Sequence, residues 1–224
     1  MLSGFSPTLI LVLNLAGTFV FGLSGGMAAV RRGLDVFGAV VLAAVVGLAG
    51  GIIRDVLIGR PPATFRDWRY LAVAGGAGLV TSLMHPTIDR LQRPIDTMDA
   101  AGLALFSVTG AATALAYGLG TAESIILGAL TGIGGGMVRD VLVGEIPEVL
   151  KGGLYAIPAL VGAGIVVLAY RQGDRSTAWP IVGAAACFTI RMAGLRYHLN
   201  LPTATDLPQS VDPRRLRKRE RPPR

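Results

Sequence analysis

The sequence predicts an all-α membrane protein with seven transmembrane helices, arranged as two inverted three-helix repeats followed by a seventh helix. Three observations predict this fold: the chain is strongly apolar, its charges are confined to short segments, and one octet returns 85 positions later. Hydrophobic residues make up 52% and charged residues 16% of the 224 positions, and the mean hydropathy is +0.57. A soluble domain of this size would need a larger share of charged residues for its surface.

Long uncharged stretches define the spans. A helix that crosses a bilayer needs roughly 20 apolar residues. Most of the uncharged stretches approach or exceed this length, whereas those at 124–138 and 176–190 need their neighbours in order to span. The first span is not expected to be a cleaved signal peptide, because the first basic residues, Arg31 and Arg32, follow it. The predicted spans are 5–30, 35–58, 69–85, 99–119, 122–144, 153–170 and 177–195.

The repeat is visible as an unbroken register. The octet GGIIRDVL at 50–57 returns as GGMVRDVL at 135–142. The same offset matches further identical residues without a gap, among them Ala16, Gly17, Phe21, Gly25, Gly33, Leu34, Gly47 and Tyr70. Each repeat holds three spans, so the second enters the membrane from the opposite face, which defines an inverted duplication. The predicted repeats are 5–85 and 99–170, and the seventh helix at 177–195 lies outside them.

The segment 201–224 is predicted to be a disordered basic tail, because it combines five prolines with seven Lys or Arg and few apolar residues. Basic residues favour the cytoplasmic side, so we expect an inner-membrane protein with its N-terminus outside and its C-terminus in the cytoplasm. Against this stand the basic residues that would then lie outside, Arg60, Arg66, Arg69, Arg171 and Arg175. Anionic lipid is a candidate partner of the tail. A nucleic-acid partner is not expected, since no folded binding module accompanies the charge.

The two octets predict a functional site inside the membrane. Glycine-rich runs favour a kink or a break in a helix. The candidate breaks are Gly50, Gly51, Gly134, Gly135 and Gly136. Non-helical backbone at that depth is tolerated only where protein or water satisfies it. Glycine-interrupted segments at corresponding positions of two halves indicate a transport site.

An Arg–Asp pair follows the glycines in each octet. Charged side chains near the middle of a span should face the bundle interior or an aqueous cavity. Sequence neighbours project about 100° apart on a helix. We therefore expect ion pairs between the repeats, Arg54 with Asp140 and Arg139 with Asp55. A simpler interpretation is that each pair marks a helix end, with the arginine reaching the lipid headgroups.

A GGxxRD octet in each half of a seven-span chain resembles the prokaryotic branch of the trimeric intracellular cation channel family. Such sequences have also been labelled as an uncharacterised membrane family and as a glycine-transporter domain. The resemblance covers about residues 5–195. It implies a homotrimer with one hydrophilic pore per subunit, which runs between kinked second and fifth helices and passes potassium and some sodium. The kinks would then lie at Gly50–Gly51 and Gly134–Gly136, and the motif charges would be the two Arg–Asp pairs.

The residues themselves are consistent with a channel. Carbonyls freed at helix breaks would coordinate a cation, and Asp55 and Asp140 would supply negative field. Tight selectivity against sodium is not expected, because no filter sequence of the TVGYG kind is present. Arg54 or Arg139 is a candidate voltage-sensitive gate, since a charge in the membrane field responds to voltage. Candidate pore hydroxyls, which alternatively bond back to their own helices, are Ser24, Ser107, Thr109 and Thr131.

The alternative function is a secondary transporter for a small zwitterion such as glycine, because inverted repeats with broken helices also suit alternating access. An enzyme is not expected: the chain has no GK[ST] phosphate loop, no HExxH and no cluster of Cys and His. The single cysteine, Cys187, lies in an apolar run and is expected to be a core residue. No cofactor or metal site is predicted, apart from the permeant potassium or sodium ion.

Overall fold

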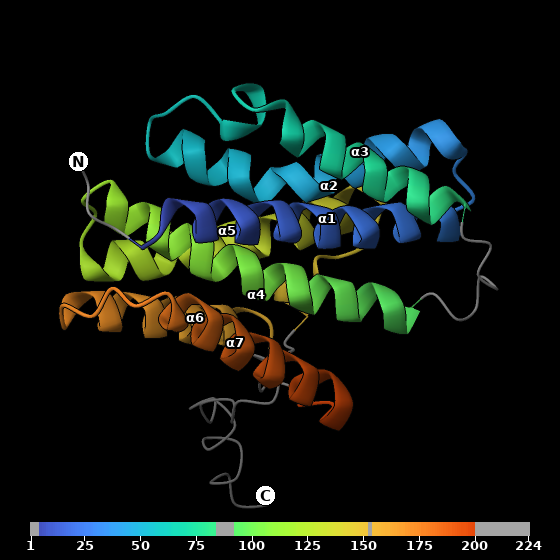
Figure 1. Cartoon of the computed structure of the whole chain (residues 1–224). Coiled ribbons are helices and arrows are strands. Elements are labelled where there is room, and N and C mark those ends of the chain that lie inside the picture. Colours follow the sequence, from blue (N-terminus) through green and yellow to red (C-terminus); the bar gives the residue numbers. More distant parts are fainter. Residues whose placement is uncertain (1–4, 84–91, 152–153, 200–224) are drawn as a thin grey trace, which may run out of the picture.

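The computed structural model describes residues 5–83, 92–151 and 154–199, and within them the chain forms seven α-helices and two short 3-10 helices. The helices lie side by side as a bundle (Figure 1). We call the end where α1 begins the N-terminal face and the end where α7 stops the C-terminal face. The elements are α1 Pro7–Arg31, α2 Val36–Leu57, η1 Ala63–Phe65, α3 Trp68–Leu83, α4 Gln92–Ala116, α5 Thr121–Leu142, η3 Glu148–Leu150, α6 Ala156–Arg171 and α7 Ala178–Tyr197.

The described helices agree with the predicted spans in number and order. Five of them, α1, α2, α4, α5 and α7, are long and apolar enough to cross a membrane, while α3 and α6 have 16 residues each. Helix α4 begins at Gln92, seven residues before the predicted start at 99. The predicted span began at 99 because charged residues precede it in the sequence. The helix nevertheless includes these residues, since a helix can extend beyond the apolar layer. The predicted tail at 201–224 and the last residues of the span at 69–85 lie outside the described residues.

The bounds of the elements repeat with the sequence offset of 85. Helices α1 and α2 correspond residue for residue to α4 and α5, and η1 corresponds to η3. The repeats run in opposite directions, since α1 starts at the N-terminal face and α4 at the C-terminal face (Figure 1). Equivalent glycines with positive φ follow the helices, at Gly33 and Gly118 and again at Gly59 and Gly144. Glycine adopts this left-handed conformation without steric cost, so each copy ends its helices in the same way.

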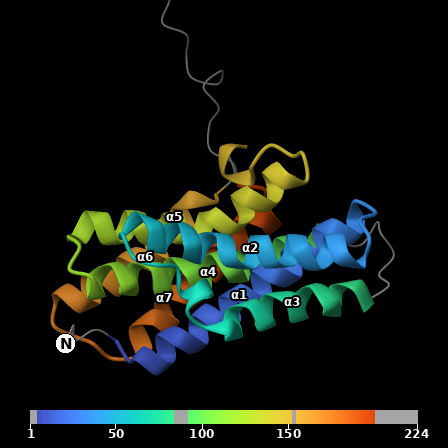
Figure 2. The same cartoon turned by 90° about the horizontal axis from the view of Figure 1, so that it is seen from above.

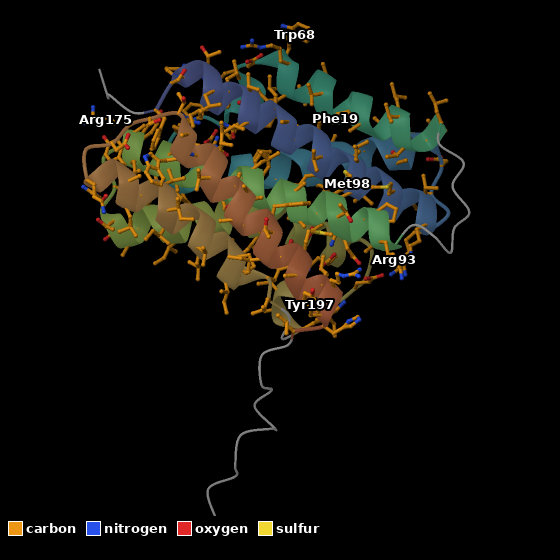
Figure 3. All side chains as sticks on the ribbon, turned by 60° about the horizontal axis from the view of Figure 1, so that its bottom comes forward. Phe19, Trp68, Arg93, Met98, Arg175 and Tyr197 are labelled. Atoms are coloured by element: carbon orange, nitrogen blue, oxygen red, sulfur yellow. The ribbon has the colours of Figure 1, made fainter. Side chains whose placement is uncertain are left out.

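Each repeat packs as a three-helix unit. Helices α1, α2 and α3 contact one another, as do α4, α5 and α6, and the halves meet through α1 with α4 and α2 with α5. Helix α7 packs on α4 and α6 and lies outside the symmetric pair of units (Figures 1 and 2). Figure 3 shows Arg175 at one end of the bundle and Arg93 and Tyr197 toward the other, with Phe19 on the outer surface between them.

Two equivalent aromatic rings lie at the centre of the bundle. Phe21 and Phe106 are buried, and their ring centroids are 5.4 Å apart. A Cβ atom on Gly17 would lie 2.6 Å from the Phe106 ring, and one on Gly102 would lie 2.6 Å from the Phe21 ring. Each ring therefore occupies space that a glycine of the other repeat leaves open. This exchange locks the two halves together at their shared centre.

Candidate functional site

The octet glycines lie inside unbroken helices. Helix α2 is continuous through Gly50 and Gly51, and α5 is continuous through Gly134–Gly136. A break of either helix at these glycines is therefore wrong, whereas the milder alternative, a kink within a continuous helix, stays a prediction. Instead the two helices approach closely, because a Cβ atom on Gly50 would overlap the carbonyl oxygen of Thr131. Because these glycines have no side chains, the backbones of α2 and α5 can approach closely, which is the usual role of small residues between membrane helices.

The first buried charge cluster surrounds Asp55 near the N-terminal face. The Arg54 Nε donates to Asp55 Oδ1 at 2.7 Å, and the Arg60 Nη2 lies 2.8 Å from the same oxygen. The other carboxylate oxygen, Oδ2, accepts the backbone N–H of Ala63 at 2.8 Å. Arg54 also donates from Nη1 to the Asn14 side-chain oxygen at 3.1 Å. Both members of the octet pair are buried, at 2% and 0% exposure.

The second cluster repeats this arrangement near the C-terminal face. Arg139 Nη2 donates to Asp140 Oδ1 at 2.7 Å, and the other oxygen of Asp140 accepts the backbone N–H of Glu148 at 2.8 Å. Arg139 Nη1 donates to Asp99 at 2.9 Å and to the Ser24 hydroxyl at 2.6 Å. The clusters use equivalent positions, so each aspartate also caps the 3-10 turn that follows its helix.

The pairing differs from the prediction. The expected ion pairs Arg54–Asp140 and Arg139–Asp55 are wrong, because each arginine pairs with its own sequence neighbour. The angle of about 100° describes where neighbouring side chains leave the helix. A long, flexible guanidinium folds back across that angle and reaches the adjacent carboxylate. The interpretation that the arginines extend to lipid headgroups is also wrong, since both are buried.

Of the four candidate hydroxyls, only Ser24 belongs to a charge cluster. Ser107 donates to the Ala104 carbonyl at 3.0 Å, Thr109 to that of Phe106 at 3.4 Å, and Thr131 to that of Leu127 at 2.6 Å. These three bond back to their own helix, which was the alternative that the sequence left open.

Helix α7 reaches the second cluster through Arg191. Its guanidinium lies 4.5 Å from the centroid of the Tyr155 ring and donates to the Leu154 carbonyl at 3.1 Å. The Tyr155 hydroxyl in turn donates to Asp99 at 3.1 Å. Helix α7 is thereby linked to the second cluster through Tyr155. The repeat equivalent of Tyr155 is Tyr70, which lies in the other half of the bundle.

Four cluster residues escaped the sequence prediction: Asn14, Arg60, Asp99 and Arg191. One signal was present, because Asn14 and Asp99 occupy equivalent positions of the 85-residue register and are both polar within predicted spans. Arg60 lies in a connection, where a basic residue indicates no particular partner. Arg191 lies in a helix outside the repeat, so no equivalent residue drew attention to it.

Two cavities enter the bundle from opposite faces. The N-terminal cavity has a volume of about 290 Å³, and its lining includes Asn14, Arg54, Arg60, Thr113 and Tyr117. The C-terminal cavity has a volume of about 20 Å³, and its lining includes Ala28, Arg32, Arg139, Asp140 and Glu145. Each cavity therefore ends on one of the two clusters. The Phe21–Phe106 pair lies in the core between the halves.

Equivalent positions also meet at the two mouths. At the N-terminal face the Arg60 Nη1 donates to the Tyr117 hydroxyl at 3.1 Å. At the C-terminal face the Arg32 Nη2 lies 2.6 Å from the Glu145 carboxylate. The hydrogen bond from Arg32 holds the pKa of Glu145 below its usual range. The contribution of this pair is therefore complete at neutral pH and is lost only as the pH falls through that lowered value.

The fold and the clusters define a polytopic helical membrane protein, built as an inverted repeat with one buried Arg–Asp cluster in each half. A family model described as "Glycine transporter" matches the chain twice, at residues 11–86 and 96–171, so that the two matches are themselves 85 positions apart. The chain belongs to this family.

Relatives and solved structures extend the assignment. A UPF0126 membrane protein of Streptomyces coelicolor is 45% identical over 198 residues, which cover 88% of this chain and 91% of the relative. The inner membrane protein YadS of Escherichia coli is 34% identical, with 85% and 94% covered. A prokaryotic TRIC channel matches with a TM-score of 0.81 and 32% identity over 88% of this chain and all of that chain.

A trimeric intracellular cation channel orthologue from Rhodobacter sphaeroides matches with a TM-score of 0.79 and 34% identity, over 86% of this chain and all of that chain. The chain is thus a member of the prokaryotic TRIC-type family, and the resemblance that the octets indicated is confirmed. These relatives are membrane proteins or channels, which also confirms that the chain is not an enzyme.

Proposed function

We propose that the chain is a potassium-permeable channel for monovalent cations, with one pathway in each subunit along the contact between α2 and α5. The observation that carries this proposal is the pair of cavities that enter from opposite faces and end on equivalent Arg–Asp clusters. Solved structures that the chain resembles at 30–34% identity are described as TRIC cation channels.

Side-chain oxygens, and not backbone carbonyls, line the proposed pathway. The octet helices are unbroken, so a cation would contact the oxygens of the clusters, such as those of Asn14, Ser24 and Asp140. Each guanidinium that opposes a cation is held by a carboxylate. Such a path exchanges only part of the hydration shell, and we therefore expect sodium to pass together with potassium.

The Phe21–Phe106 pair is the proposed central barrier, because apolar constrictions stop conduction by excluding water. We expect Phe106→Ala to raise the open probability about tenfold, which corresponds to an open state stabilised by about 1.4 kcal/mol relative to the closed state. Single-channel recording of the purified variant measures this, and Phe106→Leu keeps a smaller apolar side chain as an intermediate case. Phe19→Ala is the matched control, since Phe19 lies on the outer surface (Figure 3). An unchanged open probability in Phe106→Ala would show that the barrier lies elsewhere.

The channel is tested with purified protein in a planar bilayer under potassium and sodium gradients. We expect discrete current steps with a reversal potential that follows the cation gradient and not the chloride gradient. A chloride-following reversal potential contradicts the proposal.

The second candidate function is a secondary transporter for a small zwitterion, which the description of the family model favours. Cavities that enter from opposite faces also suit alternating access. Saturable glycine uptake into proteoliposomes without current steps would support the transporter, whereas current steps without saturable uptake support the channel.

Voltage dependence is proposed to arise from Arg54 and Arg139. Moving one charge through the membrane field is worth about 2.3 kcal/mol per 100 mV. We expect Arg54→Gln to make the open probability less steeply dependent on voltage, as measured over a range of holding potentials. Arg175→Gln is the control, because Arg175 lies at the end of the bundle (Figure 3). Equal steepness in the two variants would exclude Arg54 as a sensor.

The assembly and its placement in the membrane are also proposals. We infer a homotrimer from the description of the Rhodobacter sphaeroides orthologue as trimeric. Light scattering of the detergent-purified protein should give a mass of three chains, and a monomer or dimer would contradict this.

We further propose that the protein lies in the inner membrane, with its N-terminus outside and its C-terminus in the cytoplasm, and that the 201–224 tail binds anionic lipid. Alkaline phosphatase fused after Tyr197 should be inactive, because that enzyme folds only outside the cytoplasm.

A further inference from the structure

The two clusters are equivalent in position but opposite in charge. In the first cluster two guanidiniums, Arg54 and Arg60, share the single carboxylate of Asp55. In the second cluster one guanidinium, Arg139, is shared by the carboxylates of Asp99 and Asp140. The first cluster therefore has a formal charge of +1 and the second a formal charge of −1. The sign of the charge inverts although the fold repeats.

One equivalent pair of residues accounts for half of this inversion. Asn14 and Asp99 are 85 positions apart, and each accepts a hydrogen bond from the Nη1 atom of its own octet arginine, at 3.1 and 2.9 Å. Their geometry is the same, but one carries an amide and the other a carboxylate. The other half comes from position 60. Arg60 reaches into the first cluster, whereas its equivalent, Glu145, pairs with Arg32 at the mouth.

Neighbouring charges do not cancel the difference. Arg191 faces the second cluster through the Tyr155 ring, and the Glu148 carboxylate lies 3.7 Å from its guanidinium. The same carboxylate lies 3.8 Å from the Lys151 ammonium, which is exposed and therefore screened by water and salt. At the C-terminal mouth Arg32 is paired with Glu145, and Arg31 is exposed, so water and salt screen it. The buried charges of the two clusters thus differ in sign between the two ends of the proposed pathway.

We propose that Asn14 and Asp99 determine a directional preference of the channel, so that cations pass more easily from the C-terminal face to the N-terminal face than in the reverse direction. This inference rests on the proposed function and specifies it. Asp99 raises the local concentration of cations at the C-terminal end of the path, because fixed negative charge in a narrow cavity attracts counter-ions. The uncompensated guanidinium of the first cluster lowers it at the N-terminal end.

Four chains test the proposal: the unaltered protein, Asn14→Asp, Asp99→Asn and the double variant. Rectification, the ratio of the currents at equal and opposite voltages in symmetric potassium chloride, is measured for single channels. The unaltered chain should rectify. Each single variant halves the charge difference between the clusters, to 0 and −1 in Asn14→Asp and to +1 and 0 in Asp99→Asn, so its ratio should move part of the way toward one. The double variant leaves both clusters at a formal charge of 0, so its ratio should be near one. The expected change is about threefold, the effect of one unit charge at about 6 Å in water on a local ion concentration.

The conductance separates the two single variants. Asn14→Asp adds a carboxylate to the path and should conduct more than the unaltered chain, whereas Asp99→Asn should conduct less. Asn14→Asp also guards against a folding defect, because it gives Arg54 a carboxylate partner of the kind that Arg139 already has and loses only the hydrogen bond from the Asn14 amide to the Ile10 carbonyl of the same helix. Thr97→Asp is the matched control, since it adds the same charge to α4 in the groove beside α7, and its ratio should equal that of the unaltered chain.

The two possible failures are distinguishable. Currents that are present in all four chains with an unchanged ratio would overturn the directional preference and leave the channel intact. The absence of current in every chain, with normal elution in size-exclusion chromatography, would overturn the proposed function and this inference together.

Discussion

Arg139→Leu is expected to lower the free energy of unfolding by about 3–5 kcal/mol, because the buried carboxylates of Asp99 and Asp140 lose their shared cation. Removing one partner of a buried ionic cluster leaves an uncompensated charge, which costs more than the intact cluster contributes. In a chain of this size the corresponding fall in the melting temperature is roughly 6–20 °C. Thermal unfolding of the detergent-purified protein measures it.

A rescue variant separates the loss of charge balance from the loss of packing. Arg139→Leu combined with Asp99→Asn and Asp140→Asn should recover most of the lost stability, since neutral side chains no longer need a cation. The amide introduced at position 140 also retains an oxygen for the Glu148 N–H. Arg69→Ala is the surface control, because Arg69 and Asp67 form an exposed pair, and it should melt as the unaltered protein does. A single Arg139→Leu variant that melts like this control would contradict the role of the second cluster.

Gly50→Ala and Gly51→Ala are expected to have opposite effects although the glycines are adjacent. A methyl group on Gly50 would overlap the Thr131 carbonyl oxygen, so α2 and α5 would have to separate. Such overpacking costs typically about 1–3 kcal/mol. A methyl group on Gly51 would lie 4.0 Å from the nearest side chain, that of Arg54. Alanine there should be neutral or stabilise the helix by up to about 1 kcal/mol.

Thermal unfolding of the two alanine variants gives the comparison directly. Gly135→Ala is a third test, because Gly135 is the equivalent of Gly50 and its added Cβ atom would lie 3.0 Å from the Val46 carbonyl oxygen. We expect it to resemble Gly50→Ala in sign and to be smaller. If Gly50→Ala and Gly51→Ala destabilised the protein equally, the octet glycines would serve flexibility and not close helix contact.

The fold was readable from the sequence because hydropathy and the register are properties of the chain alone. Seven helices follow from the distribution of charges, and the inverted repeat follows from residues such as Tyr70 and Tyr155 that match without a gap. The octets were correctly singled out as buried, since Arg54 and Arg139 both lie inside the bundle. Whether they form a conduction path is a proposal that the geometry supports.

The local consequences of the octets were not readable. A glycine shows in the sequence only as a missing side chain, and its meaning depends on what occupies the space. For Gly50 the occupant is the backbone of α5, and for Gly17 it is the Phe106 ring. The partners of Arg54 and Arg139 were mistaken for a similar reason, because the reach of a guanidinium exceeds what helix geometry alone indicates. The roles of Asn14 and Asp99 emerge only from the structure, in which each accepts a hydrogen bond from an equivalent arginine.

Water access to the two cavities from opposite faces tests the central claim most directly. Thr113 and Ala28 are equivalent positions, and they line the N-terminal and the C-terminal cavity respectively. Each is replaced by cysteine in turn, with Val45→Cys on the outer surface as the control and with the native Cys187 buried in every chain. A charged, membrane-impermeant thiol reagent is then added to one side of a planar bilayer while the current is recorded.

We expect the reagent to reduce the current of Thr113→Cys only from the N-terminal face and that of Ala28→Cys only from the C-terminal face, and to leave Val45→Cys unchanged. Equal modification of Val45→Cys, or currents that remain unaffected in both cavity variants, would contradict the proposed pathway, because the ions would then cross the protein by another route.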